Sequence, residues 1–285
     1  MISGRTGILG VIGHPVAHTG SPAMHNAALE ATGLDFVYVA FAVPPEGAQA
    51  VGTAMRTLNI RGLNVTVPHK QAVMACLDEV SPEAQAIGAV NTIDHRDGRL
   101  CGHNTDAHGF IASVREDGGL QRLPGKVVLL GAGGAARAIL YALLAAPEVE
   151  HIALLNRTAA RAETLADDLD AGGRVTVGAL QDKASLTEAE LVINATSIGM
   201  EPDAGALPLG DGGGLHDGMV VVDIVYKPLE TQLLQQARAA GARTVDGLGM
   251  LVHQGARAFE IWTGVTPPVD TMRKAIQLKT TARLT

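Results

Sequence analysis

The chain has few cysteines, no excess of basic residues and no long apolar run, and each shortage excludes a class of protein. Only Cys76 and Cys101 occur among 285 residues, so the sequence predicts neither a disulfide framework nor a cysteine metal site. The 22 basic residues are outnumbered by 29 acidic ones, and the net charge of −7 gives no electrostatic footprint for nucleic acid. The apolar runs, such as 139–146, are too short to span a membrane.

Two further absences bear on location and chemistry. The N-terminus lacks a basic segment followed by a long apolar core, so we expect no signal peptide, and two unpaired thiols are typical of a cytoplasmic protein. We also expect no metal ion, because no recognisable ligand spacing is formed by His14, His18, His69 and His103. What the chain contains is 47% hydrophobic and 18% charged residues, typical of a globular enzyme long enough for two domains.

Short apolar strands alternate with helices along most of the chain, which predicts an α/β fold with parallel sheets in two parts. In the first part we expect strands at 8–12, 36–41 and 63–67, and helices at 22–31 and 46–58. In the second part we expect strands at 127–130, 151–155, 175–177, 191–194 and 220–224. A final helix is expected over 250–262, and the glycine-rich segment 205–218 is interpreted as a mobile surface loop.

The segment 126–136 carries the most informative motif. The apolar run Val127–Leu130 predicts a buried parallel strand, and a helix is expected to follow over 135–146. The glycine-rich turn between them allows a tight bend and lets a pyrophosphate approach the N-terminus of the helix. We therefore expect a Rossmann-type dinucleotide site. The alternative is a Rossmann-like domain that binds no nucleotide.

The end of the next strand predicts which dinucleotide is bound. An NAD site usually carries an acid there, which binds the ribose 2′-hydroxyl. Here the strand 151–155 is followed by Asn156 and Arg157, so a guanidinium stands where the carboxylate would be. A guanidinium suits a 2′-phosphate, which predicts NADP. The alternative is that Arg157 is only a surface charge.

Polar clusters follow several strands of the N-terminal part, where open α/β sheets build their ligand crevices. Together they offer hydroxyls, amides, one ammonium and one carboxylate, which suits a small polyhydroxylated acid. The clusters are His18–Pro22, Asn64–Lys70, Gly88–Thr92 and Gly102–Asp106.

In order and spacing, these motifs resemble the shikimate dehydrogenase family over almost the full length of the chain. The matching segments are Gly13–His18 with Ser21–Pro22, Asn64–Lys70, Gly88–Thr92, Asn104–Asp106, Gly131–Ala135, Asn156–Thr158, Asn194–Ser197 and Asp246–Gln254. The resemblance implies NADP-linked interconversion of 3-dehydroshikimate and shikimate in the aromatic amino-acid pathway. It also implies a small-molecule substrate, no nucleic-acid or membrane partner, and a monomer or homodimer.

The resemblance further implies two α/β domains with separate tasks. Residues 1–106 and 248–285 are expected to form the substrate-binding and catalytic domain, on which the C-terminal helices pack back, and residues 107–247 the Rossmann NADP-binding domain. Substrate contacts are expected from Thr19, Ser21, Asn64, Thr66, Asn91, Tyr226 in the crevice between domains, and Gln254. Cofactor contacts are expected from Gly131, Ala132, Gly133, Gly134, Ala135, Asn156, Arg157, Thr158, Arg161, Thr196, Ser197, Gly247 and Met250.

Lys70 and Asp106 are the expected catalytic residues. Hydride delivery to a ketone puts negative charge on its oxygen, and a cationic donor such as Lys70 stabilises that charge and supplies the proton. Asp106 either holds Lys70 and the substrate hydroxyl in place or takes part in proton transfer, and the sequence leaves both roles open. Taken singly, Lys70 also fits a solvated lysine, and Asp106 the N-cap of a helix beginning at Ala107.

Simpler roles exist for the binding residues as well. Ser21 is expected to cap the helix 22–31, with Pro22 at its first position, in addition to any ligand role. Asn64 and Asn91 also fit turn residues, and Thr66 fits a strand position with no ligand. The motif series as a whole favours the binding roles.

One position departs from the family pattern, which usually reads Ser-x-Ser-Pro with both hydroxyls on the substrate carboxylate. Here Thr19 replaces the first serine. Threonine keeps the hydroxyl and adds a methyl group, so carboxylate binding is expected to survive, while the preference between shikimate and quinate stays open. The alternatives are a quinate/shikimate dehydrogenase of broader choice and a catalytically silent NADP sensor. The pair Lys70 and Asp106 argues against the sensor, which needs no proton relay.

Overall fold

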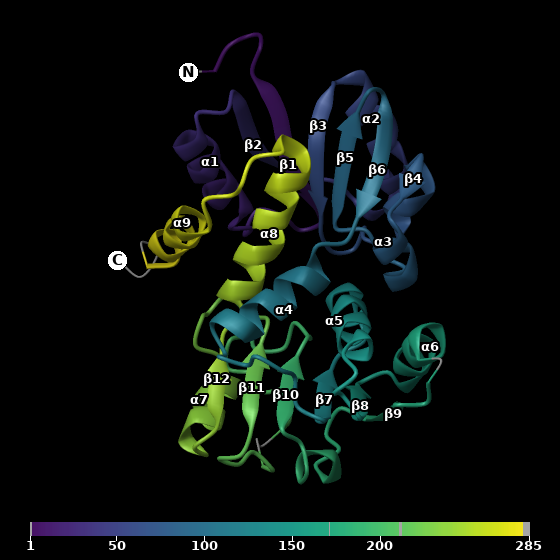
Figure 1. The fold of residues 1–285 in the computed structure, drawn as a ribbon, viewed down its shortest axis with the longest axis vertical. Helices are drawn as coiled ribbons and strands as arrows, with labels where there is room; N and C mark the ends of the chain where they lie inside the picture. The colour runs from purple at the N-terminus through teal and green to yellow at the C-terminus, as the bar shows by residue number, and fades with distance from the viewer. Residues whose placement is uncertain (1, 171, 211–212, 282–285) are drawn as a thin grey trace. The chain divides into compact units, whose positions relative to one another are not determined.

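The computed structural model describes residues 2–170, 172–210 and 213–281, which form two compact units. Unit 1 comprises Met1–Asp106 and Val252–Thr285, and unit 2 comprises Ala107–Leu251. Each unit is built on one six-stranded sheet flanked by helices (Figure 1). The α/β fold class predicted from the sequence is confirmed.

The first half of the unit 1 sheet is parallel, as predicted. β1 (Gly7–Gly13) pairs in parallel with β2 (Phe36–Ala42) on one side and with β3 (Ile60–Val65) on the other. The full strand order is β2-β1-β3-β5-β6-β4. The carboxyl ends of β1 and β3 therefore lie together, and they lead into the polar segments around Thr19 and Lys70.

The second half of this sheet corrects the prediction of parallel strands throughout. β5 (Thr92–Arg96) pairs antiparallel with both β3 and β6 (Arg99–His103), and β4 (Glu79–Val80) forms the edge. β5 and β6 are joined by only Asp97 and Gly98, whose φ angles are 53° and 78°. Positive φ at both positions is the geometry of a tight hairpin turn, which forces the two strands to run in opposite directions.

The first helix of unit 1 begins one residue earlier than predicted. α1 (Ser21–Thr32) has Gly20 at its N-cap and no side-chain cap, so the expected capping role of Ser21 is wrong. Pro22 is tolerated in this first turn because its missing N–H would find no partner within the helix. The Ser21 hydroxyl is thereby left for contacts with other side chains.

Two other predicted elements of unit 1 are shorter than expected. The helix expected over 46–58 is a 3-10 turn, η1 (Pro45–Ala50), followed by α2 (Val51–Thr57), and 3-10 turns are common at helix N-termini. The strand expected to reach position 67 ends at β3's Val65, before the Val67–Pro68 bond. The remaining short elements are η2 (Ala72–Cys76) and α3 (Pro82–Ile87), the latter capped by Ser81.

The C-terminal helices pack on unit 1, as the sequence predicts. Within α8 (Leu248–Thr263), Trp262 donates its indole N–H to the carbonyl of Ile93 on β5 at 3.0 Å. A Cβ on Gly62 would lie 2.3 Å from the same indole nitrogen, so β3 needs glycine where the tryptophan lies against it. α9 (Val269–Thr281) packs beside α1 (Figure 1).

Unit 2 is a parallel sheet with the strand order β12-β11-β10-β7-β8-β9. The two central strands are buried except at Lys126 and apolar except at Lys126 and Asn194, as expected for strands covered on both faces. The chain moves outward from β7 in opposite directions, so the switch point of the sheet lies between β7 and β10. The strands are β7 (Lys126–Leu130), β8 (His151–Asn156), β9 (Val175–Ala179), β10 (Leu191–Asn194), β11 (Val220–Asp223) and β12 (Arg243–Val245).

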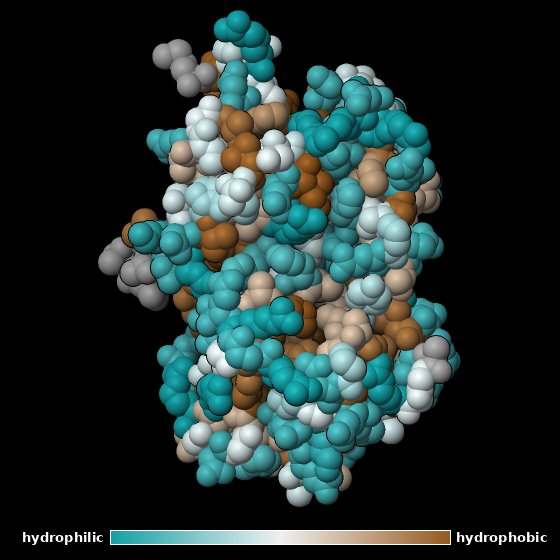
Figure 2. Space-filling model, in the orientation of Figure 1, coloured by the Kyte–Doolittle hydropathy of each residue, from teal (hydrophilic) through white to brown (hydrophobic). Residues whose placement is uncertain are grey.

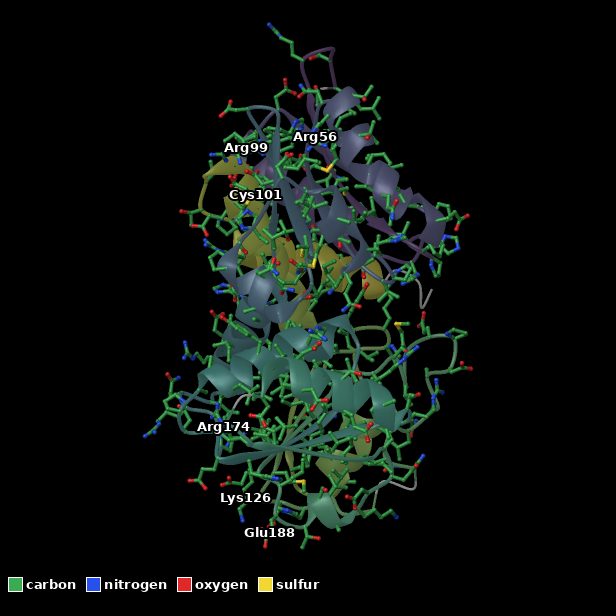
Figure 3. The ribbon with its side chains drawn as sticks, turned by 90° about the vertical axis from the view of Figure 1, so that its right-hand side faces the viewer. Arg56, Arg99, Cys101, Lys126, Arg174 and Glu188 are labelled. Atoms are coloured by element: carbon green, nitrogen blue, oxygen red, sulfur yellow. The ribbon has the colours of Figure 1, made fainter. Side chains whose placement is uncertain are left out.

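Short helices cover the sheet of unit 2 and polar contacts secure its connections. Arg174, just before β9, donates to the carbonyl of Val149 at 2.8 Å and so ties β9 to the loop before β8 (Figure 3). Lys126 and Glu188 form an exposed ion pair of 2.6 Å at the start of β7 (Figure 3). The helices are α4 (Asp106–Glu116), α5 (Gly134–Ala145), α6 (Ala159–Leu169), η3 (Ala184–Leu186) and α7 (Gln232–Ala239).

The glycine-rich segment 205–218 is only partly a surface loop. Residues 211 and 212 lie outside the described part of the chain. Among the others, Leu209 is 1% exposed and belongs to the hydrophobic core of unit 2, which also contains Val192 and Leu234. The segment is therefore anchored by an apolar contact that its composition does not reveal.

The surface is mostly hydrophilic on the face shown in Figure 2, and the two cysteines form no disulfide, as the composition predicts. Hydrophilic residues cover most of the face shown in Figure 2, and hydrophobic residues form separate patches. Within the described residues, no helix has both the length and the apolar character that crossing a membrane requires. Cys76 and Cys101 are free, half-buried thiols, and Cys101 lies on β6 two residues from Arg99 (Figure 3).

Candidate functional site

Lys70 and Asp106 lie in contact in unit 1. Lys70 follows β3 in a loop, and Asp106 is the first residue of α4, yet Lys70 Nζ is 2.5 Å from Asp106 Oδ2. Their side chains are 14% and 7% exposed, so the ion pair is largely shielded from water. Partial burial strengthens the attraction between the charges and keeps both groups in one geometry. The two expected catalytic residues thus form a single cation–carboxylate pair, and Lys70 is not a freely solvated lysine.

The second oxygen of Asp106 is held by Asn91. Asn91 Nδ2 donates to Asp106 Oδ1 at 2.8 Å, and the backbone N–H of Thr105 donates to Asn91 Oδ1 at 2.8 Å. Because a backbone N–H can only donate, the Asn91 amide has one orientation. The carboxylate contacts Lys70 and Asn91, and α4 begins at Asp106 itself, so its reading as an N-cap for a helix starting at Ala107 is wrong.

Asn64 extends this network toward β2. Its Nδ2 donates to the carbonyl of Asn91 at 3.3 Å and to Thr92 Oγ1 at 3.2 Å, and its Oδ1 accepts from the Tyr38 hydroxyl at 2.7 Å. Asn64 is buried at the end of β3, so each of these bonds is shielded. Tyr38 was not among the residues expected from the sequence. The feature of the sequence that could have indicated Tyr38 is its hydroxyl, the single polar side-chain group in the strand Phe36–Ala42.

The two hydroxyls before α1 lie together. Thr19 Oγ1 is 3.1 Å from Ser21 Oγ and also accepts the N–H of Ser21 at 3.3 Å. Ser21 is buried and Thr19 half-buried. Thr66 follows β3 and is half-buried. Its backbone N–H donates to the carbonyl oxygen of Ile12 at 2.9 Å. The Thr66 methyl group would lie 2.5 Å from a Cβ on Gly13, so glycine is required there.

Two aromatic rings are fully buried beside these groups. Burial raises the pKa of Tyr38 well above its usual range, and a side-chain hydrogen bond from Ser21 opposes that rise. Burial also lowers the pKa of His25 to about 3, against a smaller opposing contact with Asn64. The rings stack at 4.3 Å between centroids and 6° between planes. Tyr38 is therefore a neutral hydroxyl and His25 an uncharged imidazole at neutral pH.

The remaining two expected substrate residues are half-buried on separate elements. Gln254 lies on α8 within unit 1. Tyr226 follows β11 in unit 2. Their place in a binding site stays a prediction.

The glycine-rich turn of unit 2 has the backbone that a phosphate site needs. Gly131 has a φ of +106°, and a Cβ there would lie 3.0 Å from the carbonyl oxygen of Ala195. Gly133 is the extended N-cap of α5, its Cβ position is open, and no side chain caps the helix. The first N–H groups of this twelve-residue helix thus have no side-chain cap, and a helix N-terminus of this kind stabilises an anion. Ala132, Gly134 and Ala135 are half-buried around the same turn.

The segment after β8 presents two guanidinium groups. Asn156 Nδ2 donates to the carbonyl of Thr158 at 2.8 Å, which folds the turn before α6. Arg157, Thr158 and Arg161 are exposed. In the described part of the chain neither arginine has an ion-pair partner. Two unpaired cations beside the end of β8 favour an anionic ligand.

A buried acid organises the neighbouring strand ends. Asp223 accepts hydrogen bonds from Asn194 at 2.9 Å, Thr231 at 2.7 Å and the Val225 N–H at 3.0 Å. Thr196 Oγ1 donates to Asn194 Oδ1 at 2.7 Å, so the acid also orders that turn. Burial raises the pKa of Asp223 to about 6, although the three donors act against the rise. Sequence reasoning missed Asp223. The feature that could have indicated it is a single acidic residue at the end of the apolar strand 220–223.

The other expected cofactor residues lie close to these turns. Ser197 is exposed after Thr196, and Met250 is buried in the first turn of α8. A Cβ on Gly247 would lie 2.3 Å from the carbonyl oxygen of Ile224, so this position requires glycine. No group of three or more His, Cys, Asp or Glu side chains that could hold a metal occurs in the described ranges. The buried His69 instead contacts the carbonyl of Val43 at 2.7 Å.

Comparisons with known proteins agree along the whole chain. Residues 11–93 match the shikimate dehydrogenase substrate binding domain, residues 120–201 match shikimate / quinate 5-dehydrogenase, and residues 247–277 match the shikimate 5′-dehydrogenase C-terminal domain. The shikimate dehydrogenase (NADP+) of Symbiobacterium thermophilum is 51% identical over 276 residues, which cover 94% of this chain and 92% of that protein.

Solved structures show the same similarity. A shikimate dehydrogenase in complex with NADP+ is 44% identical, covers 98% of both chains and superposes with a TM-score of 0.90. The enzyme of Thermus thermophilus, in complex with NADP(H) and shikimate, is 43% identical with a TM-score of 0.86. That match covers 95% of this chain and 99% of the other.

Proposed function

Because this chain belongs to the shikimate dehydrogenase family, we propose that it catalyses the reversible, NADP-dependent reduction of 3-dehydroshikimate to shikimate in the aromatic amino-acid pathway. The observation that carries this assignment is the shielded Lys70–Asp106 pair at the end of the buried amide network. A pair of this kind supplies the proton chemistry that reduction of a ketone requires.

Unit 1 provides the groups for a small hydroxylated acid. Thr19 and Ser21 place two hydroxyls together for the carboxylate. Asn64, Thr66 and Asn91 offer amide and hydroxyl groups for the ring hydroxyls, and Gln254 completes the proposed set in unit 1. Tyr226, which belongs to unit 2, is the remaining proposed substrate residue. A ligand hydroxyl that enters such a network forms hydrogen bonds with groups already fixed in place, which lowers the entropy cost of binding.

Unit 2 provides the groups for NADP. The open N-terminus of α5 beyond Gly131 and Gly133 fits a pyrophosphate, because uncapped N–H groups and the helix dipole both favour negative charge. Arg157 and Arg161, with Asn156 and Thr158, fit the additional 2′-phosphate. The proposed set also includes Ala132, Gly134, Ala135, Thr196, Ser197, Gly247 and Met250. When bound, NADPH supplies the hydride.

The protein's own part in the reaction is to hold and deliver a proton. As the ketone carbon is reduced, its oxygen gains negative charge, and the Lys70 ammonium beside it stabilises that charge and gives up a proton from Nζ. Asp106 keeps Nζ oriented through its 2.5 Å contact, and Asn91 fixes the carboxylate in turn. In the reverse direction Lys70 accepts the proton from the substrate hydroxyl.

Two further features of the enzyme are proposed, one from its thiols and one from the family resemblance. We infer a cytoplasmic protein, because its two thiols are unpaired. We also infer that its partners are small molecules, with a monomer or homodimer as the working form. Light scattering on the purified protein measures that form directly.

Quinate is the alternative substrate, and one observation bears on the choice between it and shikimate. Thr19 carries a methyl group next to the Ser21 hydroxyl, where the family pattern has serine, so the pocket differs where the carboxylate is proposed to bind. The deciding experiment measures absorbance at 340 nm with purified protein, NADP or NAD, and shikimate or quinate. We expect NADP reduction with shikimate at the highest kcat/KM. If the protein turns over quinate and not shikimate, quinate is its substrate.

A further inference from the structure

A continuous line of side-chain hydrogen bonds joins Tyr38 on β2 to Asp106 at the start of α4. Tyr38 donates to Asn64 at 2.7 Å, Asn64 donates to Thr92 at 3.2 Å, and Thr92 donates to Asn91 at 3.0 Å. Asn91 then donates to Asp106 at 2.8 Å. All five residues are less than one-tenth exposed, so water does not compete for these bonds.

The direction of this line is fixed by backbone groups. The Thr105 N–H donates to Asn91 Oδ1, and the Asn91 carbonyl accepts from Asn64 Nδ2. A backbone N–H cannot accept and a carbonyl cannot donate, so neither amide can turn over without losing a bond. Asn64 Oδ1 therefore has to accept, and the Tyr38 hydroxyl has to donate. Every donor in the line points toward the Asp106 carboxylate.

Tyr38 is held in this position by α1. Asn26 clamps its backbone with two bonds, Nδ2 to the Tyr38 carbonyl at 2.8 Å and the Tyr38 N–H to Oδ1 at 2.9 Å. The His25 ring stacks on its face at 4.3 Å. Ser21 lies on the same helix, and its side chain opposes the rise in the pKa of the tyrosine that burial causes. The phenol oxygen is thus fixed at the start of the amide network by contacts on its backbone and on its ring.

We propose that Tyr38 is a positioning residue, whose hydroxyl orients Asn64 and, through Thr92 and Asn91, the Asp106 carboxylate that holds Lys70. Its kinetic consequence rests on the proposed function, while its structural consequence does not. The tyrosine acts on the proton-transferring pair through the amide network, without contacting the reacting atoms. A tyrosine that only filled the core would need its ring and not its hydroxyl.

The test is Tyr38→Phe, which keeps the ring and its stacking on His25 and removes only the hydroxyl. We expect kcat/KM for shikimate to fall by about threefold to thirtyfold, the range for one buried hydrogen bond, with the KM for NADP unchanged. Tyr141→Phe is the matched control, because it makes the same chemical change on α5 in unit 2. The control is expected to keep wild-type kinetics with shikimate.

Thr92→Val tests the next link with a change of nearly equal shape. If the line acts as a unit, Tyr38→Phe and Thr92→Val together cost less than the product of their separate effects. Fully multiplicative effects, or wild-type kcat/KM in Tyr38→Phe, overturn the proposal.

An activity-independent readout separates this inference from the proposed function. The side-chain NH₂ signals of Asn64 and Asn91 are followed by ¹H–¹⁵N NMR without substrate. Movement of the Asn91 signals in Tyr38→Phe, with no movement in Tyr141→Phe, supports the line even if shikimate proves not to be the substrate. Unchanged Asn91 signals overturn it.

Discussion

Asn194 and Asp223 are paired directly across the parallel ladder of β10 and β11, and Asn194 Nδ2 donates to Asp223 Oδ1 at 2.9 Å. The same carboxylate accepts from Thr231 and from the backbone N–H of Val225. One buried acid therefore joins the turn that carries Thr196, the segment before Tyr226 and the start of α7. Because these segments leave the carboxyl edge of the sheet, the acid orders the edge where the nucleotide is proposed to bind.

This acid predicts a pH-dependent stability. Burial raises the pKa of Asp223 from 3.8 to about 6, so between these values the folded protein binds a proton that the unfolded chain has released. The protonated Asp223 carboxyl stabilises the folded protein fully below pH 4. This stabilisation, about 3 kcal/mol in total, is lost as the pH rises through 6. The free energy of unfolding of the wild type should fall relative to that of Asp223→Asn over this window, measured by urea denaturation. The exposed-site variant Asp203→Asn is the control, and a constant difference between wild type and Asp223→Asn would contradict the prediction.

Replacing the proposed proton donor should affect turnover more than binding. Lys70→Met removes the ammonium and keeps a side chain of similar length, so kcat should fall by roughly two to four orders of magnitude. The KM for shikimate should change little, because the hydroxyls and amides remain. Steady-state kinetics measures both, with the exposed Lys274→Met as the control for the same substitution. A kcat within about tenfold of wild type would show that another group donates the proton.

The cofactor preference should depend on Arg157. Arg157→Asp replaces a charge-assisted contact with repulsion of the 2′-phosphate, so the KM for NADP should rise far more than that for NAD. Arg5→Asp, an exposed position in unit 1, makes the same change of charge away from the proposed site. Equal kcat/KM values for NADP and NAD in the wild type would remove the basis for assigning the 2′-phosphate to this arginine.

The hydroxyl of Thr19 should contribute to substrate binding. Thr19→Val keeps the shape and deletes the hydroxyl next to Ser21. A hydrogen bond to a charged group contributes roughly 1.5–3 kcal/mol, so kcat/KM for shikimate should fall about ten- to more than a hundredfold. Wild-type kinetics in this variant would mean that the carboxylate is held elsewhere.

The methyl group of Thr19 is tested separately. Thr19→Ser keeps the hydroxyl and enlarges the pocket by one methyl group, so activity with shikimate should be retained. If that methyl excludes the bulkier quinate, the ratio of quinate to shikimate turnover should rise. The ratio is measured with both substrates at saturating NADP, and an unchanged ratio assigns the methyl no part in substrate choice.

The nucleotide-binding unit was predictable from the sequence because its signals are local. An apolar run, a glycine turn and a helix follow one another within 126–146, and the structure has β7 and α5 in these positions. The parallel pairing of β7 with β8 and β10 follows from strands whose residues are apolar except at their ends. The arginine that follows β8 could also be identified from the sequence, because its position depends only on where the strand ends.

The parts that sequence reasoning missed depend on contacts between distant segments. Tyr38 contacts Asn64 across a sequence separation of 26, and Asp223 contacts Asn194 across 29, so neither partner is visible in a local pattern. The β5–β6 hairpin is different. Its Asp97–Gly98 dipeptide is a recognised turn signal between two short runs, and it was available in the sequence.

The β5–β6 hairpin connects the turn at Asp97 and Gly98 with the Asn91–Asp106 hydrogen bond at its opposite end. Its register pairs Thr92 with His103. Asn91 comes directly before this pair and Asp106 lies three residues after it, so the two come within hydrogen-bonding distance although 15 positions separate them. A slip of one residue would turn every side chain of a strand to the opposite face and draw Asn91 away from the carboxylate. The loop at Asp97 and Gly98 is thus free to vary in composition within its backbone geometry, but its length is set by the distance at which Asn91 reaches Asp106.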